Sequence, residues 1–76
     1  MEVIIGRIYK HYKSDYYIVE NIAIHSETGE KMVIYRALYE NGTVYARPYD
    51  MFLEKVEGKG QAYRFQLQDI NSVVKH

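Results

Sequence analysis

The segment RALYENGTVYARP, residues 36–48, has an arginine near each end and a turn sequence between them, an arrangement in which two arginines can hold one ligand. Its Asn-Gly pair at 41–42 favours a two-residue type I′ turn between two β runs. That register puts Arg36 directly opposite Arg47. Like charges in direct opposition destabilise a sheet, so the pair predicts either a shared internal acid, such as Glu20 or Glu54, or an anionic ligand.

The segment GRIYKHYK, residues 6–13, mixes cations with aromatic rings. Single-stranded nucleic-acid binders use this mixture, because cations contact phosphates and ring faces stack on bases. Strand alternation places Arg7, Tyr9, His11 and Lys13 on one face. An edge strand that lysines guard against aggregation would produce the same pattern, so both interpretations stay open.

These two segments together predict one candidate surface. We expect it to be the ligand-binding surface of a non-catalytic module that recognises an anionic partner, either a nucleic acid or an acidic peptide. Small β barrels commonly bind extended ligands in aromatic grooves, which is an analogy at the level of the fold. The candidate ligand-binding residues are Tyr9, His11, Arg36, Tyr45 and Arg47.

The cluster HSET, with its histidine at position 25, offers a different chemistry. A histidine beside carboxylates binds metals or acts as a general base, so a small metal-dependent hydrolase centred on His25 and Glu27 is one alternative. A polar hairpin turn, in which the side chains bond the backbone, explains the same residues. A third possibility is a structural module that docks on a larger protein through exposed tyrosines.

Composition argues against several classes of function. The chain has 76 residues and no cysteine, which excludes thiol chemistry and thiolate metal sites. No nucleophile motif or Gly-rich phosphate loop is present, so we expect no enzyme, no cofactor and no metal. Ten basic residues balance ten acidic ones, so binding of a polyanion has to come from a local patch. The start of the sequence lacks the basic region and long apolar run of a signal peptide, so we expect no leader, no membrane span and a cytoplasmic protein with no membrane partner.

The elements that must position these residues are mostly strands. Alternation and β-branched content predict five of them, and Pro48 predicts a stop followed by a single helical turn in PYDMFLEKV. We expect Met51, Phe52 and Val56 to plug one end of the fold. The predicted strands are VIIGRIYKHYK at 3–13, YYIVENIAIH at 16–25, MVIYRALY at 32–39, TVYAR at 43–47 and AYRFQLQ at 62–68.

This order predicts a mainly β fold, a small five-stranded barrel of SH3 type with a short helical turn before the last strand. An open meander is the alternative. We expect one β-barrel domain over residues 1–68. Residues 69–76 form a tail that is either a short helical turn or frayed.

The chain also resembles a family of small bacterial proteins called domain of unknown function 1653. The resemblance covers Gly6 to Phe65 and implies an SH3-type barrel without an established activity. Two positions differ from the family pattern: Ser14-Asp15 replaces a turn that tends to contain glycine, and Tyr45 replaces a common tryptophan. The resembling elements are Gly6, HYK at 11–13, Tyr17, Val19, Ala23, HSETGE at 25–30, VIYRALY at 33–39, RPYDMFLEKV at 47–56 and YRF at 63–65.

Overall fold

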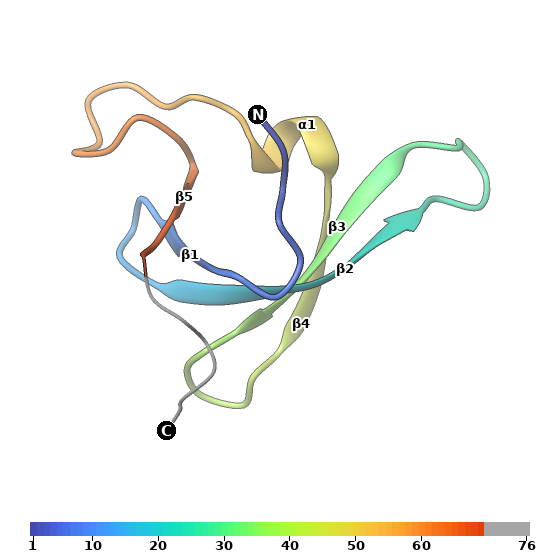
Figure 1. Cartoon of the computed structure of the whole chain (residues 1–76), viewed down its shortest axis with the longest axis horizontal. Coiled ribbons are helices and arrows are strands. Elements are labelled where there is room, and N and C mark those ends of the chain that lie inside the picture. The colour runs from blue at the N-terminus through green and yellow to red at the C-terminus, as the bar shows by residue number, and fades with distance from the viewer. Residues whose placement is uncertain (70–76) are drawn as a thin grey trace.

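Five strands and one short helix make up the fold, as expected. The computed structural model describes residues 1–69. The helix precedes the last strand, which confirms the helical turn predicted after Pro48, and the chain path is shown in Figure 1. In chain order the elements are β1 Ile8–His11, β2 Tyr16–Ile24, β3 Lys31–Ala37, β4 Val44–Pro48, α1 Tyr49–Phe52 and β5 Phe65–Leu67.

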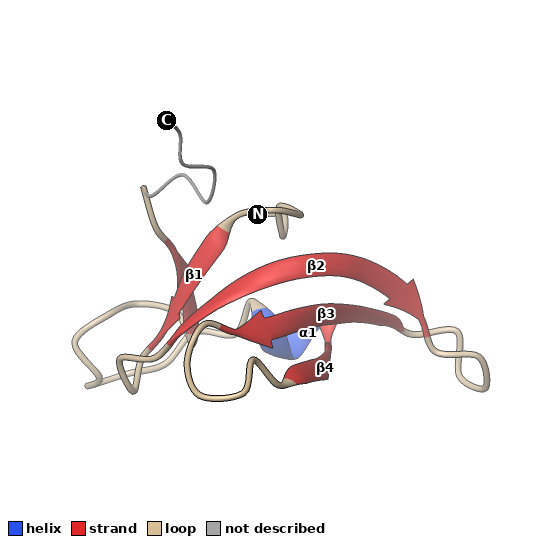
Figure 2. Ribbon diagram, turned by 90° about the horizontal axis from the view of Figure 1, so that it is seen from below, coloured by secondary structure: helices blue, strands red, loops and turns tan. Residues whose placement is uncertain are grey.

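All five strands pair antiparallel in one sheet, in the order β4-β3-β2-β1-β5. The strands β4 and β5 are therefore its two edges, and among residues 1–69 they do not pair with each other. Figure 2 shows β4 at one margin of the sheet, next to β3. The mainly β class is confirmed, whereas closure into an SH3-type barrel is not.

One face of this sheet carries the core, and we call it the inner face. Because side chains alternate along a strand, Val19, Val33 and Tyr35 all point to this side, and each is at most 4% exposed. Phe52 of α1 packs on them with no exposed surface, and its ring stacks on Phe65 at a centroid distance of 4.1 Å. The opposite side of the sheet, which includes Arg36 and Val44, is the outer face.

The β3–β4 hairpin differs from its predicted register. Arg36 lies opposite Val44, three residues before the predicted partner Arg47. The loop runs from Leu38 to Gly42, because the Ala37 N–H donates to the Thr43 carbonyl at 2.9 Å. This loop is longer than a two-residue type I′ turn, and its positive-φ residues are Glu40 and Gly42, at 51° and 66°, instead of Asn41 and Gly42.

This shift separates the two arginines. A shift by an odd number of residues turns the whole strand over, because side chains alternate with a period of two. Arg47 therefore pairs with Val33 and lies on the inner face, while Arg36 lies on the outer face. The predicted side-by-side arginine pair is wrong.

A bulge interrupts β2 at Glu20, where the pairing with β3 shifts between Val19 and Asn21. The N-terminal arm bonds the backbone at this point, since the Gly6 N–H donates to the Val19 carbonyl at 2.8 Å. Gly6 has a φ of 87°, a conformation in which glycine avoids strain.

The expected plug of three apolar side chains is only partly formed. Phe52 is fully buried, but Met51 on the same helical turn is 43% exposed and Val56 is half-buried. A single turn of helix can point only one side of its surface at the core, which leaves Met51 in solvent. Most of the predicted tail, residues 70–76, lies outside the described residues.

Candidate functional site

Arg36 is held on the outer face by an acid. Its Nε and Nη2 atoms donate to the two carboxylate oxygens of Glu20, at 2.6 and 3.1 Å, and its Nη1 donates to the Gly42 carbonyl at 3.1 Å. This bidentate hydrogen bond and the charge of Glu20 raise the pKa of Arg36. Glu20 is one of the two acids that the sequence suggested as an internal partner. The hydrogen bonds of the Arg36 guanidinium are therefore made to groups of the protein itself.

Arg47 lies on the inner face among aromatic rings. Its Nε donates to the Tyr35 hydroxyl at 3.1 Å, and its Cζ lies 5.5 Å from the centre of the Phe65 ring. The two ion pairs within residues 1–69 are Arg36 with Glu20 and Arg64 with Glu54, so Arg47 has no carboxylate partner in that part of the chain. A half-buried guanidinium over ring surfaces, without an acid, can bind an external anion.

His11 belongs to the same inner face, at the end of β1. Its ring meets Phe65 edge to face at 4.9 Å, and its Nδ1 accepts a hydrogen bond from the Lys13 N–H. Burial lowers the pKa of His11, and the positive charges of Arg47, Arg64 and Lys13 lower it further, against an opposing effect of Asp15. His11 thus lies in a positive potential that an anion would relieve.

Tyr45 and Tyr9 share the inner face but differ in access. Tyr45 is 41% exposed and packs against Tyr35 at a centroid distance of 5.7 Å, so it borders the Arg47 region. Tyr9 is only 3% exposed, and its hydroxyl accepts the Ile4 N–H at 3.0 Å. Of the five candidate residues, the structure brings together His11, Tyr45 and Arg47, while Tyr9 is a core residue and Arg36 lies on the other face.

Two further residues complete this site. Phe65 is the ring that both Arg47 and His11 contact. Arg64 adds a charge close enough to lower the His11 pKa, although its Nη2 also bonds the Glu54 carboxylate at 2.6 Å. The sequence pattern of YRF, a cation between two rings, could have indicated Arg64 and Phe65 as candidates. Only the pairing of β5 with β1 places this segment next to His11. We call the set His11, Tyr45, Arg47 and Arg64, together with the buried ring of Phe65 beneath them, the inner aromatic-basic surface.

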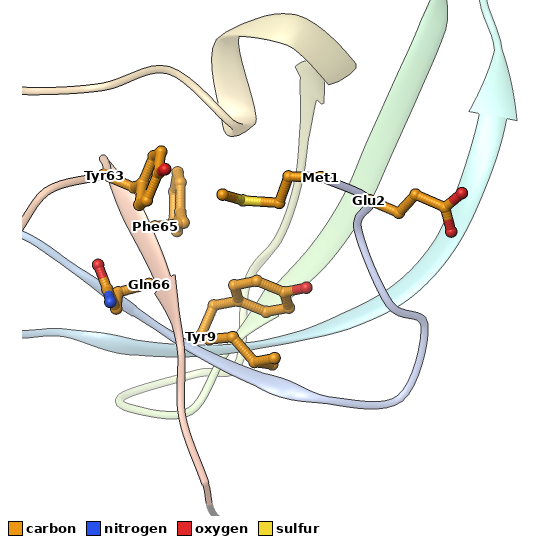
Figure 3. Close-up of a pocket in the computed structure, with 7 residues that line it drawn as sticks. Met1, Glu2, Tyr9, Tyr63, Phe65 and Gln66 are labelled. Carbon is orange, nitrogen blue, oxygen red and sulfur yellow. The ribbon is translucent and has the colours of Figure 1, made fainter.

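A small apolar pocket lies at the β5 end of the sheet. It has a volume of about 270 Å³, and Figure 3 shows Met1 extending toward Phe65 and Tyr63. The Glu2 carboxylate points away from these rings. Since the lining is mostly apolar, this pocket offers no anchor for an anion. Its lining residues are Met1, Glu2, Tyr9, Tyr63, Phe65, Gln66 and Leu67.

The histidine of the HSET cluster takes part in a turn. The Nδ1 of His25 accepts the N–H of Glu27 at 3.1 Å, and the His25 N–H donates to the Glu30 carbonyl. Within residues 1–69 no three His, Cys, Asp or Glu side chains lie close enough to share a metal ion. A pocket of about 380 Å³ is lined by Glu30 of this turn together with Lys31, Tyr49 and Asp50.

No helix within residues 1–69 has the length and apolar character needed to span a membrane. This finding concerns helices in the described part of the chain alone.

Comparisons with known proteins agree with the observed fold. A crystal structure of a DUF1653 protein from Bordetella bronchiseptica is similar, with a TM-score of 0.75 and 29% sequence identity. The match covers 96% of this chain and 95% of that one. Curated proteins gave no significant match. The family model described as "Protein of unknown function (DUF1653)" matches residues 7–67. Since that match spans most of the chain, the protein belongs to the DUF1653 family.

Proposed function

We propose that this protein is a non-catalytic binding module whose inner aromatic-basic surface recognises an anionic partner, a nucleic acid or an acidic peptide. The observation that carries the proposal is the state of Arg47. Its guanidinium lies half-buried over Phe65 and beside Tyr35, and it forms no ion pair within residues 1–69. Placing a cation there without an acid costs free energy that an anionic ligand would recover.

The surroundings of Arg47 support an anion rather than a neutral ligand. Arg64 and Lys13 also raise the positive potential at His11, so three cations act on one small region. The exposed ring of Tyr45 offers a flat apolar contact at its border. Together they supply charge for a phosphate or carboxylate and a ring for an attached base or side chain.

Two finer expectations form part of this proposal. SH3-type barrels commonly bind extended ligands in aromatic grooves. By analogy between folds, we propose that this five-stranded fold is of SH3 type and binds an extended ligand in the same way. A cytoplasmic location stays a prediction from the sequence.

The alternative functions have unequal support. For a hydrolase at His25 and Glu27, the histidine would have to leave the turn hydrogen bonds that now occupy its Nδ1. A structural docking module is favoured by exposed apolar side chains around the β3–β4 turn: Leu38 is 47% exposed and Val44 is 45% exposed.

A pair of matched variants tests the anion proposal. Arg47→Gln and Arg36→Gln remove the same charge from opposite faces, so global charge effects cancel in the comparison. We expect Arg47→Gln to weaken binding of octathymidylate or hexaglutamate about tenfold, as lost charge-assisted hydrogen bonds do. Arg36→Gln should leave affinity unchanged. The measurement is the change in amide shifts during titration at low salt, repeated at high salt, where phosphate contacts weaken.

Two outcomes contradict the proposal. The first is that neither probe shifts the amides of His11, Tyr45 or Arg47 at low salt. The second is that both variants lose the same affinity. The second result would mean that the probes respond to net charge alone. Binding of a protein from lysate to wild type and to both variants alike would instead favour the docking module.

A further inference from the structure

Among residues 1–69, the β4 edge of the sheet carries backbone groups that have no hydrogen-bond partner, and we call it the free edge of β4. In an antiparallel pair, residues alternate between turning their N–H and C=O toward the partner strand and turning them away from it. The hydrogen bond from Ala37 N–H to Thr43 C=O sets this alternation, so Tyr45 and Arg47 bond β3. Val44 and Ala46 therefore turn their N–H and C=O outward, where no hydrogen bond within residues 1–69 reaches them.

This edge is protected only at its C-terminal end. Proteins guard such edges with charged side chains, proline, bulges or very short strands. In the strand VYARP the charged residue and the proline come last, the pairing with β3 is regular over the whole length, and Val44, Tyr45 and Ala46 are all exposed. Pro48, the next residue with an outward backbone, has no N–H to donate, so it ends the free edge.

The opposite edge is different. Strand β5 has only three residues, Phe65–Leu67, and the N-terminal residues Met1 and Glu2 lie beside it around the apolar pocket. By the same alternation, Phe65 and Leu67 turn their backbone groups outward on β5, as Val44 and Ala46 do on β4, but the N-terminal residues already border the β5 edge. The β4 edge is accordingly the better template for another strand.

The side chains of β4 indicate what kind of peptide could pair with its free edge. Tyr45 and Arg47 lie on the inner face and Val44 and Ala46 on the outer face. An added strand places its own side chains next to these on the same faces, within contact distance. A carboxylate beside Arg47 would meet the Nη groups of a guanidinium that has no acid partner within residues 1–69, and a small apolar residue would cover Val44 and Ala46.

We infer that the anionic partner is an extended acidic peptide that adds as a strand to the free edge of β4, with alternate acidic residues on the inner face and apolar residues on the outer face. This inference rests on the proposed function, since it names the partner of the inner aromatic-basic surface. Backbone hydrogen bonds to Val44 and Ala46 supply affinity, and the contact with Arg47 supplies selectivity for acids.

A designed peptide tests strand addition directly. The probe is the capped peptide TVEVEVT, whose valines would cover the outer face while its glutamates approach Tyr45 and Arg47. The charge control is TVKVKVT. Two further controls carry N-methyl groups on alternate amides, either on the valines or on the glutamates, which keeps the charge but removes one row of donors. We expect shifts at Val44–Arg47 for the acidic peptide, at least tenfold weaker binding for the lysine peptide, and loss of binding for one of the two methylated peptides.

The protein variant Ala46→Pro complements these probes. The Ala46 N–H points away from β3, so proline removes no ladder hydrogen bond and the thermal midpoint should stay close to that of wild type. Peptide binding should be lost. If proline perturbs the fold, the methylated peptides still decide the question on the wild-type protein.

Several outcomes overturn the inference, and they are distinguishable from failure of the proposed function. Strand addition is wrong if Ala46→Pro keeps its fold and its full affinity, or if both methylated peptides bind normally. Where that binding still depends on Arg47, the proposed function survives. Binding of octathymidylate but not of TVEVEVT assigns the surface to nucleic acid instead. Concentration-dependent dimers that Ala46→Pro abolishes would show that a second copy occupies the edge.

Discussion

Arg36 and Arg47 carry the same charge on neighbouring strands, yet their side chains bind different kinds of partner. Arg36 lies on the outer face, where Glu20 accepts two of its hydrogen bonds and the Gly42 carbonyl accepts a third. Arg47 lies on the inner face, where its nearest partners are a tyrosine hydroxyl and an aromatic ring. The two arginines differ because they lie on different faces of the sheet: the outer face supplies a carboxylate partner, and the inner face supplies aromatic rings.

Strand alternation explains part of this difference. Arg36 pairs with Ile18, and Glu20 comes two residues later on β2, just where the pairing shifts. Residues two apart on a strand share a face, so the acid lies on the same outer face as Arg36. The inner face at Arg47 is filled by Tyr35, Tyr45 and Phe65.

The largest expected effect comes from removing the ring beneath Arg47. Phe65→Ala deletes a side chain that is 3% exposed and contacts Phe52, Tyr35 and His11. We expect a loss of about 3 to 5 kcal/mol in the free energy of unfolding, measured by urea denaturation. The outer-face control Val44→Ala should change it by less than about 0.5 kcal/mol. Equal effects of the two variants would show that the core does not lie on the face that carries Arg47.

A smaller effect is expected at the turn that supports Arg36. Gly42 has a φ of 66°, and its carbonyl accepts a hydrogen bond from Arg36. Gly42→Val should cost about 1 to 3 kcal/mol of stability, because a β-branched residue is strained at positive φ. Gly42→Asn, which tolerates that conformation, is the control and should cost less.

Thermal unfolding of these two variants measures that effect. Below the unfolding transition, affinity for an anion at Arg47 should be the same in both, because the substitution is confined to the Arg36 side. A Gly42→Val protein that unfolds like wild type would remove the support for this turn geometry.

The smallest expected effect is a dependence on pH at His11. Its pKa lies below the ordinary value of 6.5, chiefly through burial and then through Arg47, Arg64 and Lys13, with Asp15 opposing. At pH values above the ordinary pKa, the histidine is neutral in both the folded and the unfolded protein, so it does not lower the stability. As the pH falls below the ordinary pKa, the unfolded chain takes up a proton that the folded protein resists, so the stability falls. An anion at Arg47 offsets these charges, so affinity for octathymidylate should rise over the same range.

His11→Gln provides the comparison for the pH effect. Thermal midpoints and affinities of variant and wild type would be measured from about pH 7.5 to about pH 5, a range that spans the usual histidine pKa. The wild-type protein should lose more stability than the variant on acidification, and only the wild type should gain affinity from His11. Parallel profiles for the two proteins would mean that His11 lies outside the electrostatic reach of the bound anion.

Much of the fold followed from local patterns. Alternation along YRFQL and β-branched residues in YYIVENIAI predicted strands because these patterns depend on neighbours in sequence. Pro48 likewise predicted the change from strand to helical turn, since it lacks an N–H for the ladder. The burial of Phe52 with exposure of Met51 did not follow, because it depends on how one helical turn meets β3 and β4.

The candidate site was only partly predictable for a related reason. His11, Tyr45 and Arg47 have types suited to an aromatic-basic surface, and the structure brings them together. The predicted partner of Arg47 was wrong because the Asn-Gly signal indicated a two-residue loop, whereas the hydrogen bond from Ala37 to Thr43 closes a loop from Leu38 to Gly42. Arg64 was missed because its proximity to His11 arises from a pairing between opposite ends of the chain.

The sequence by itself determined the β class, the number of strands, the helical turn after Pro48 and the supply of cations and rings, because each of these depends on residues close together in the chain. The tertiary structure alone decided which face each arginine occupies and which acid it meets. The physical reason is the two-residue period of a strand: the three-residue difference in the β3–β4 register moves Arg47 from the outer face with Glu20 to the inner face with Phe65.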